Sequence, residues 1–192
     1  DVSSYGIDIY GEYRLAHLLD LLCEIDGIEW IRLLYCYPDK ITDELIDTMA
    51  SQPKVLHYID LPLQHADDKI LKAMNRHSTV EETREATRKL PDIAIRTTFI
   101  VGFPGEGDDE FETLAEFVNE EEFERLGCFE YSPQEGTPAA KMENQVDDDV
   151  KSRRAEVIMQ DQYEIMTEKN NNMIGKTLRV LTESYDDYTD SD

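Results

Sequence analysis

A short glycine-rich turn is the segment best suited to contact a ligand. The turn from Gly102 to Glu106 (GFPGE) directly follows the apolar run from Ala94 to Val101. Its two glycines allow the backbone to turn sharply and to approach a bound molecule closely. The first N–H groups of a following helix could meet a carboxylate or another polar edge. The Gly-Lys-Ser/Thr ending of a phosphate loop is missing, and Glu106 would repel phosphate. A tight turn without a ligand is the alternative.

Other polar residues accompany predicted strands. Arg96 lies inside the apolar run, and a buried guanidinium needs a partner. We therefore expect Arg96 to meet either an acid, which we favour, or an anionic ligand. Gln64 and His65 follow another predicted strand and can both donate and accept hydrogen bonds. His65 could be a base or a ligand, although an isolated histidine more often has a structural role. Glu106, Glu130 and Glu135 could form a paired-carboxylate site, although acidic residues are common throughout this chain.

The sequence predicts no metal site. Cys23, Cys36 and Cys128 are widely separated and match no Cys-x-x-Cys motif. No second histidine stands at metal-ligand spacing from His65. An odd number of scattered cysteines is typical of reduced thiols in a cytosolic protein, where they serve as buried packing residues.

The elements that must position these residues alternate between strands and helices. We expect strands at 30–35, 55–63, 94–101 and 126–131, the third of them buried on both faces. Helical patterns follow the strands, with Thr42 as one predicted N-cap and Asp108 or Asp109 as another. This alternation predicts parallel βαβ units. In such a sheet the ligand binds at the carboxyl ends of the strands.

The later part of the chain has a different pattern. A long polar helix is predicted from 147 to about 173, followed by a strand over Thr177–Leu181 that lacks a partner and by a frayed end at 186–192. We divide the chain into a β/α unit at 1–146, a connecting helix at 147–175 and a final segment at 176–192. The first unit is shorter than the roughly 250 residues of a complete eightfold barrel, so we expect either a partial barrel or an open parallel sheet.

Charge narrows the possible partners. The 192 residues include 43 acidic and 19 basic ones, which gives a net charge of −24. Such a charge opposes unassisted binding to nucleic acid and attracts a basic protein, unless it serves solubility alone. No apolar run approaches the roughly 20 residues of a membrane span, and no signal peptide is recognisable. The chain starts with Asp1 and not with Met, so we interpret it as an internal piece of a longer protein.

Five strings occur in a characteristic order: SSYGIDIY, EWIRLLYCYP, YIDLPLQHADDKILKAMNR, IAIRTTFIVGFPGE and ERLGCFEYSPQEGTPAA. They closely resemble the methylthiotransferases of the radical S-adenosylmethionine (SAM) superfamily, from Asp1 to about Leu181. The nearest branch is the RimO family, which modifies an aspartate of a ribosomal protein. The string LGCFEYSPQEGT favours this branch over the relatives that modify adenosine in transfer RNA.

The resemblance implies an α/β fold, a partial TIM-like radical-SAM barrel that binds S-adenosylmethionine across its strand ends. Asp1 matches a stretch near the methionine end of the cofactor, and Gln64 and His65 match the region near the ribose. The remaining matches lie on two further strands: Arg96, Thr98, Ile100, Gly102, Phe129 and Tyr131. After Lys176 the chain is similar to the opening of a small TRAM-like β-barrel that helps to engage the substrate. No catalytic residue is assigned.

In this family a Cys-x-x-x-Cys-x-x-Cys loop holds a 4Fe-4S cluster, which reduces S-adenosylmethionine to give a radical that takes hydrogen from the aspartate β-carbon. A second cluster, held by an N-terminal domain, delivers sulfur. Both cysteine-bearing parts are missing here, so no cluster can form on this chain. We expect the core of a cytoplasmic enzyme that acts on a basic small-subunit ribosomal protein, inactive as this piece alone. The alternatives are a transfer RNA methylthiotransferase and a non-catalytic half-barrel that binds a partner.

Overall fold

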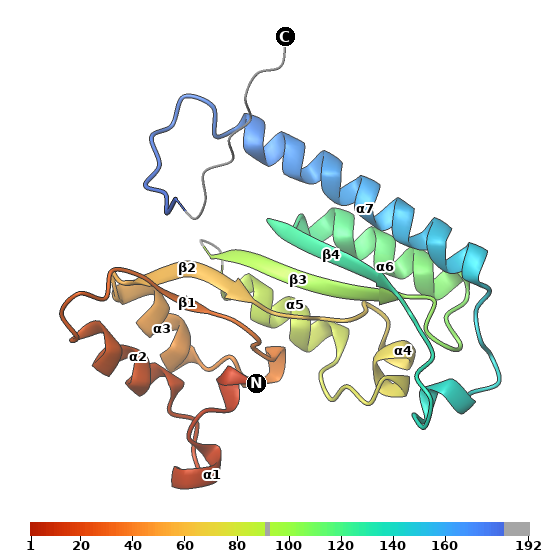
Figure 1. Ribbon diagram of the computed structural model, residues 1–192, viewed down its shortest axis with the longest axis horizontal. Coiled ribbons are helices and arrows are strands. Elements are labelled where there is room, and N and C mark those ends of the chain that lie inside the picture. Colours follow the sequence, from red (N-terminus) through yellow and green to blue (C-terminus); the bar gives the residue numbers. More distant parts are fainter. Residues whose placement is uncertain (91–92, 183–192) are drawn as a thin grey trace.

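Four parallel strands form one sheet, in which each strand lies beside the strand that precedes it in the chain (Figure 1). The computed structural model describes residues 1–90 and 93–182. The strands are β1 (Ile31–Leu33), β2 (Val55–Asp60), β3 (Ala94–Val101) and β4 (Arg125–Glu130). Consecutive parallel neighbours joined by helices are the repeating unit of a barrel wall. The predicted α/β fold and partial barrel are confirmed.

The helices gather on one side of the sheet, and the longest one runs along β4 (Figure 1). They are α1 (Ile7–Tyr10), α2 (Leu15–Cys23), α3 (Asp43–Ser51), α4 (Asp68–Ala73), α5 (Val80–Arg88), α6 (Asp108–Glu121) and α7 (Asp148–Asn171). Short 3-10 turns occupy Val2–Ser4, Pro38–Lys40 and Ala139–Lys141. Within the described residues, no helix combines the length and the apolar character that crossing a membrane requires.

Side chains fix the starts of most helices. Thr42 caps α3 as predicted, because its hydroxyl oxygen accepts the N–H of Leu45 at 3.2 Å. The prediction for α6 was wrong, since its N-cap is Gly107 and neither Asp108 nor Asp109. Glycine has no side chain to accept a bond, so Glu110 reaches back and accepts the Gly107 N–H at 2.8 Å. The turn that precedes α6 is therefore tied to the first turn of that helix.

Strand β3 is buried on one face only, which corrects the expectation of burial on both. Ile95, Thr97, Phe99 and Val101 are buried against the helices, whereas the alternate residues are exposed or half-buried. The reason is that the second face of a barrel wall looks toward the barrel interior, and nothing among the described residues covers it. Residues on that face are consequently available to a ligand.

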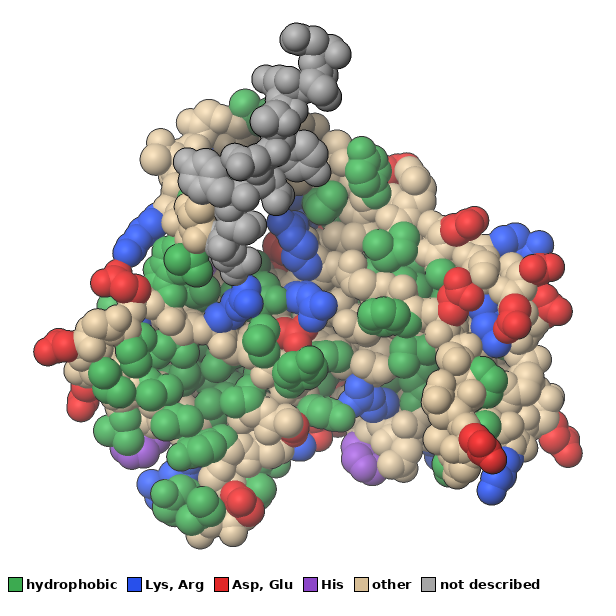
Figure 2. Space-filling model, in the orientation of Figure 1, with side chains coloured by type: hydrophobic (Ala, Val, Ile, Leu, Met, Phe, Trp, Pro, Cys, Tyr) green, Lys and Arg blue, Asp and Glu red, His purple; other side chains and the backbone are tan. Residues whose placement is uncertain are grey.

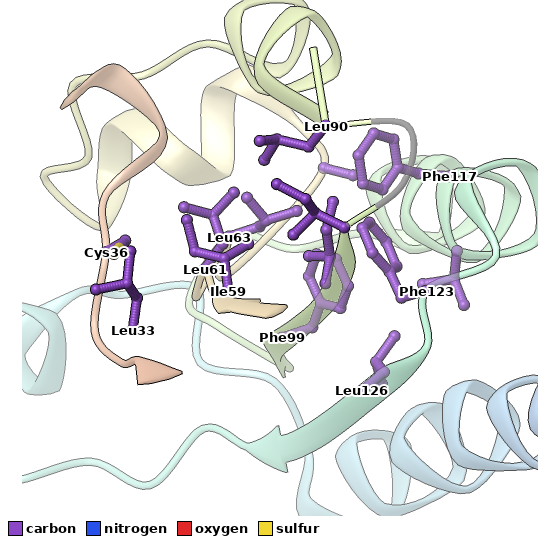
Figure 3. Packing of buried hydrophobic residues seen from close by; sticks show 14 of the residues in the cluster. Leu33, Cys36, Ile59, Leu61, Leu63, Leu90, Phe99, Phe117, Phe123 and Leu126 are labelled. Atoms are coloured by element: carbon purple, nitrogen blue, oxygen red, sulfur yellow. The ribbon is translucent and has the colours of Figure 1, made fainter. Parts of the chain in front are cut away.

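The core lies between the sheet and its helices (Figure 3). Phe99 of β3 is fully buried and meets Phe117 of α6 edge-on, with ring centroids 6.2 Å apart. Phe123, at the entry to β4, completes the aromatic cluster at 5.9 Å from both rings. These three rings join β3 to α6, the two elements on either side of the glycine-rich turn. The turn is therefore held by rigid elements at both ends.

Helix α7 packs against β4 and α6, and the side chains that it buries are mostly polar or charged. Ile158 is fully buried, and the Gln162 amide donates to the carbonyl of Phe123 at 3.0 Å. The segment Thr177–Leu181 forms no strand, so that prediction was wrong. An extended segment needs a neighbour for its backbone hydrogen bonds, and the described part of the chain offers none. The predicted frayed end at 186–192 lies outside the described residues.

Replacing Phe99 by alanine should destabilise the chain by about 3–5 kcal/mol, because a fully buried ring leaves a cavity. Urea unfolding followed by circular dichroism measures the change in the free energy of unfolding. The matched control is Phe129→Ala, since Phe129 is 62% exposed and should cost less than about 1 kcal/mol. Equal losses for both variants would contradict the assignment of Phe99 to the core.

Candidate functional site

The carboxyl ends of the strands form one continuous rim. Gln64, which follows β2, donates its N–H to the Thr98 carbonyl at 2.8 Å and accepts the Ile100 N–H at 2.9 Å. Gln64 has a φ of 75°, an uncommon backbone conformation for a residue with a side chain. Phe129 pairs with Ile100 in the register of β3 and β4. Four of the predicted cofactor-binding residues are thus neighbours along this rim.

Gly102 directly follows β3 and has a φ of 71°, a conformation that favours glycine. Its N–H donates to the Glu106 carboxylate at 2.9 Å, so the turn closes on its own last residue. The Gly105 N–H donates to the carbonyl of Asn144 at 2.8 Å, which anchors the middle of the turn to the segment before α7. Gly105 has a φ of 90°, so the left-handed backbone conformation accounts for both glycines of the turn.

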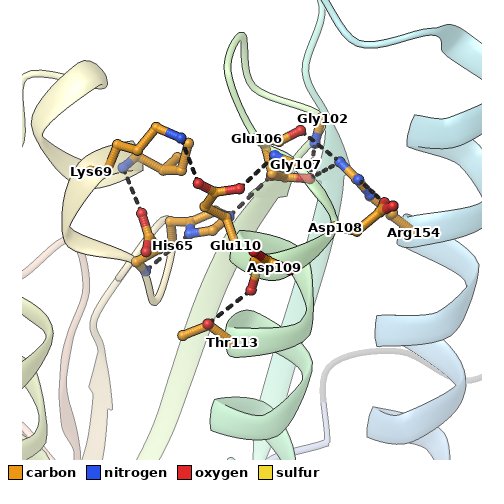
Figure 4. Close-up of polar contacts among 12 residues, drawn as sticks. His65, Lys69, Gly102, Glu106, Gly107, Asp108, Asp109, Glu110, Thr113 and Arg154 are labelled. Atoms are coloured by element: carbon orange, nitrogen blue, oxygen red, sulfur yellow. Dashed lines mark hydrogen bonds and ion pairs between the residues drawn. The ribbon is translucent and has the colours of Figure 1, made fainter.

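The Glu106 carboxylate is the centre of a buried network (Figure 4). Its Oε2 lies 3.0 Å from Nε2 of His65, and its Oε1 accepts from Nη1 of Arg154 at 2.8 Å. Nδ1 of His65 accepts the Asp67 N–H at 3.1 Å, so the ring proton must lie on Nε2, which donates to Glu106. Both ring nitrogens of His65 are therefore occupied by protein groups. This arrangement is the structural role that an isolated histidine usually has.

Two aromatic residues follow on β4 and just beyond it. Phe129 is 62% exposed and lies on the uncovered face of the sheet. Tyr131 donates its N–H to the Val101 carbonyl at 2.8 Å, and its ring meets Phe103 edge-on with centroids 5.1 Å apart. The Tyr131 hydroxyl is buried without a hydrogen-bond partner among the described residues. The ring of Phe129 offers an apolar contact surface at the rim.

Asp1 lies at the opposite end of the rim, beside the residues that follow β1. The N–H of Val2 donates to the carbonyl of Tyr35 at 3.1 Å. The Asp1 carboxylate accepts from Nζ of Lys40 at 2.7 Å and from the hydroxyl of Ser4 at 2.6 Å. Asp1 is thus on the same edge of the sheet as the other predicted residues, although the order of strands separates it from Gly102.

Arg96 pairs with an acid, as favoured from the sequence. Its Nη1 donates to Oδ1 of Asp60 at 2.7 Å, and Oδ2 of Asp60 accepts the N–H of Tyr35 at 3.1 Å. Asp60 is 2% exposed at its side chain, whereas Arg96 is 47% exposed. The expectation of a buried Arg96 was wrong, because Arg96 is on the uncovered face of β3. The buried partner of the pair is the carboxylate.

The uncovered face has a distinct surface. Figure 2 shows hydrophobic side chains gathered over the sheet with basic side chains among them, while acidic side chains lie mainly toward the outline of the molecule. The exposed ring of Phe129, which pairs with Ile100 in the register of the sheet, contributes to this surface. Arg32 stacks over the ring of Tyr58 at 5.5 Å from its centroid. An acidic chain thus presents a mixed apolar and basic surface on the inner side of its sheet.

The cysteines do not fit an iron–sulfur cluster. In the described ranges, no group of three or more His, Cys, Asp or Glu side chains could hold a metal ion. Burial raises the pKa of Cys36 to about 12, with a contribution from Asp60. Burial also raises the pKa of Cys128 to about 12. The three cysteines also lie on separate elements, at the end of α2, after β1 and within β4, where β1 and β4 are the two edges of the sheet. The expected packing role is confirmed for Cys36, which is buried, whereas Cys23 and Cys128 are only partly buried.

Comparison with known families identifies this architecture. The sequence profile described as "Radical SAM superfamily" matches residues 2–118. The chain belongs to the radical SAM superfamily. The matched range includes β1 to β3, the glycine-rich turn and most of α6.

Curated relatives extend the match along nearly the whole chain. The ribosomal protein uS12 methylthiotransferase RimO of Heliobacterium modesticaldum is 51% identical over 187 residues, which cover 95% of this chain and 41% of that protein. RimO of Geobacter sulfurreducens is 48% identical over 194 residues, covering 99% of this chain and 43% of the relative. The resemblance seen in the five strings is confirmed, and the chain spans about two fifths of the length of these relatives.

A solved radical SAM structure supports the fold. Coproporphyrinogen III oxidase (HemN) of Escherichia coli superposes with a TM-score of 0.60 at 16% identity, over 81% of this chain and 36% of that one. The methyltransferase TsrM of Kitasatospora setae gives a TM-score of 0.55 at 17% identity, over 66% of this chain and 26% of the other. At such low identity the likeness concerns the fold alone.

Three charged residues at the rim were missed by sequence reasoning. Asp60 is the last residue of β2, and a carboxylate at the end of a largely apolar strand could have indicated a site residue. Lys151 and Arg154 lie on α7, in a polar stretch rich in both charges. Their burial, at 4% and 6% exposure, has no local signature because it depends on how α7 packs.

The raised thiol pKa values predict slow alkylation. At pH 8, iodoacetamide should label Cys36 and Cys128 roughly a thousandfold more slowly in the folded chain than in denaturant, since three pH units separate about 12 from the ordinary value of 9.0. Labelling should speed up as the pH rises toward 12, because the thiolate fraction grows. Peptide mass spectrometry gives the rate for each cysteine. Fast labelling of Cys36 in the folded chain at pH 8 would contradict its burial.

Proposed function

We propose that this chain is the S-adenosylmethionine-binding core of an enzyme that methylthiolates a small-subunit ribosomal protein. The observation that carries the proposal is 51% identity, over 95% of the chain, to a relative named ribosomal protein uS12 methylthiotransferase. Because the chain spans 41% of that relative, the activity belongs to the longer protein and not to this part by itself. The site of modification in the substrate is the β-carbon of an aspartate, as the family resemblance implies.

The residues of the rim fit S-adenosylmethionine. Asp1, Gln64 and the side chain of Arg96 would face the polar parts of the molecule. Gly102 would shape the turn beside the ligand through its left-handed backbone, and the exposed ring of Phe129 would contact an apolar face. Thr98, Ile100 and Tyr131 would complete this surface. His65 would act indirectly, because it holds the Glu106 carboxylate and does not face the cofactor. When bound to a reduced cluster, S-adenosylmethionine supplies radical chemistry.

The 4Fe-4S cluster does not fit the described residues of this chain, so we assign it to another part of the longer protein. The separate places of Cys23, Cys36 and Cys128 in the fold support this assignment. The role of this chain is then to bind and orient the cofactor, and it should not cleave the cofactor alone.

A basic protein is the partner that the charge favours. With a net charge of −24, the chain attracts a cationic surface and repels a phosphate backbone. A ribosomal protein is a partner of that kind, which argues for a protein substrate over transfer RNA. Reduced cysteines are consistent with a cytoplasmic location. The segment 176–192 would begin a TRAM-like β-barrel after the connecting helix at 147–175.

The first test is binding of S-adenosylmethionine to this chain, measured by isothermal titration calorimetry. Phe129→Ala should weaken binding about fivefold, corresponding to the loss of roughly 1 kcal/mol of apolar contact. The matched control is Leu21→Ala on α2, a residue 48% exposed and outside the rim, which should leave binding unchanged. Absence of binding by the unmodified chain would contradict the proposed site.

Activity is tested separately. Under reducing conditions the chain alone should release no 5′-deoxyadenosine above the level of a protein-free control. The longer protein with its clusters should increase the mass of the ribosomal protein by one methylthio group, as followed by mass spectrometry. Modification of transfer RNA in place of the protein would overturn the proposed substrate, and cleavage by the chain alone would overturn the assignment of the cluster.

A further inference from the structure

Helix α7 carries two buried cations to the glycine-rich turn. Lys151 and Arg154 are one helical turn apart, and both are almost completely buried. The preceding residue on the helix, Arg153, is exposed. Burying two charged side chains on a mostly polar helix costs free energy unless each is well paired. Their partners therefore indicate what this end of α7 does.

Arg154 bridges the turn and the first residue of α6 (Figure 4). Its Nη1 donates to the backbone carbonyl of Glu106 at 3.1 Å and to the carboxylate Oε1 of Glu106 at 2.8 Å. Its Nη2 donates to Oδ1 of Asp108 at 2.8 Å. The planar guanidinium thus fixes both the backbone and the side chain of Glu106, a geometry that a single ammonium cannot reproduce.

The carboxylate held by Arg154 in turn holds Gly102. Oε1 of Glu106 accepts the Gly102 N–H as well as the guanidinium, and Oε2 accepts from His65. Without Arg154, one buried oxygen of Glu106 would lose its cationic partner. The carboxylate would then be drawn toward solvent, away from the N–H of Gly102.

Lys151 closes the other side of Gly102. A Cβ built on Gly102 would lie 2.2 Å from Cγ of Lys151, so the lysine stem occupies the space next to the glycine backbone. The ammonium group bonds to Asp148 at 2.7 Å and lies 5.8 Å from the centre of the Tyr131 ring. The backbone of Gly102 is thus enclosed by α7 on one side and held through Glu106.

We propose that α7 positions the glycine-rich turn and that Arg154 is the residue through which it does so. Arg154 fixes Glu106, and Glu106 fixes the N–H of Gly102, so the turn is preorganised before a ligand arrives. Arg154 does not contact the ligand. The part of this inference that concerns ligand affinity depends on the proposed function, because it takes the turn to bind S-adenosylmethionine. The part that concerns the Gly102 backbone stands on the contacts alone.

The test compares Arg154→Met with Arg153→Met, two neighbouring arginines of which only the first is buried. Under conditions where circular dichroism shows each variant folded, Arg154→Met should bind S-adenosylmethionine about tenfold more weakly, because the turn must be ordered on binding. Its Gly102 amide should exchange with deuterated solvent at least tenfold faster. Arg153→Met should match the unmodified chain in both. Arg154→Lys should recover part of the affinity, since an ammonium can reach Glu106 but cannot also hold Asp108.

Unchanged affinity and unchanged Gly102 exchange in folded Arg154→Met would overturn the inference. If Arg154→Met does not fold, Arg154→Lys and Asp108→Ala decide the matter. The Asp108 side chain is fully exposed, so its loss removes only the outer anchor of Arg154, and a two- to threefold loss of affinity is expected. No effect in either variant would overturn the inference. If the unmodified chain binds no S-adenosylmethionine, the proposed function fails, while Gly102 exchange still tests the positioning role.

Discussion

A buried carboxylate must be neutralised, and the rim of this sheet depends on how Glu106 meets that requirement. Removing an ionised carboxylate from water costs several kcal/mol unless hydrogen bonds and an opposite charge replace the solvent. Here the replacements come from two distant parts of the chain, His65 after β2 and Arg154 on α7, and from Gly102 at the start of the same turn, just after β3. One side chain thereby ties two strands and a helix to a single point, next to the residues expected to meet the cofactor.

Much of the fold could be predicted because its signals are local. The run from Ala94 to Val101 was predicted with the bounds that β3 has, since β-branched and apolar residues without a break are typical of a strand. Thr42 was predicted as a cap from its position before a helical pattern, and the structure confirms it. The parallel direction of the strands follows from the regular alternation of strands and helices. The choice of a partial barrel over an open sheet came from the family resemblance.

The remainder depended on facts that no local pattern contains. An apolar strand does not reveal that one of its faces is uncovered, so the exposure of Arg96 was missed. Arg154 lies 48 residues after Glu106, in a stretch where charged residues are ordinary. Its burial arises from the packing of α7 on β4 and α6, which is a tertiary property. The residues of the candidate rim could therefore be predicted by resemblance, whereas the contact between Arg154 and Glu106 that supports the rim could not.

Because the Glu106–Arg154 pair is buried, salt should affect the surface charges of this chain and the turn around Gly102 differently. Dissolved ions screen exposed charges beyond about 8–10 Å at physiological concentrations, but they act weakly on a pair shielded from water. The mutual repulsion of the many acidic side chains on the surface should therefore change with salt, as should any attraction to a basic protein. The turn around Gly102 should keep its shape throughout that range. Encounter and local geometry are thus controlled by different charges within one chain.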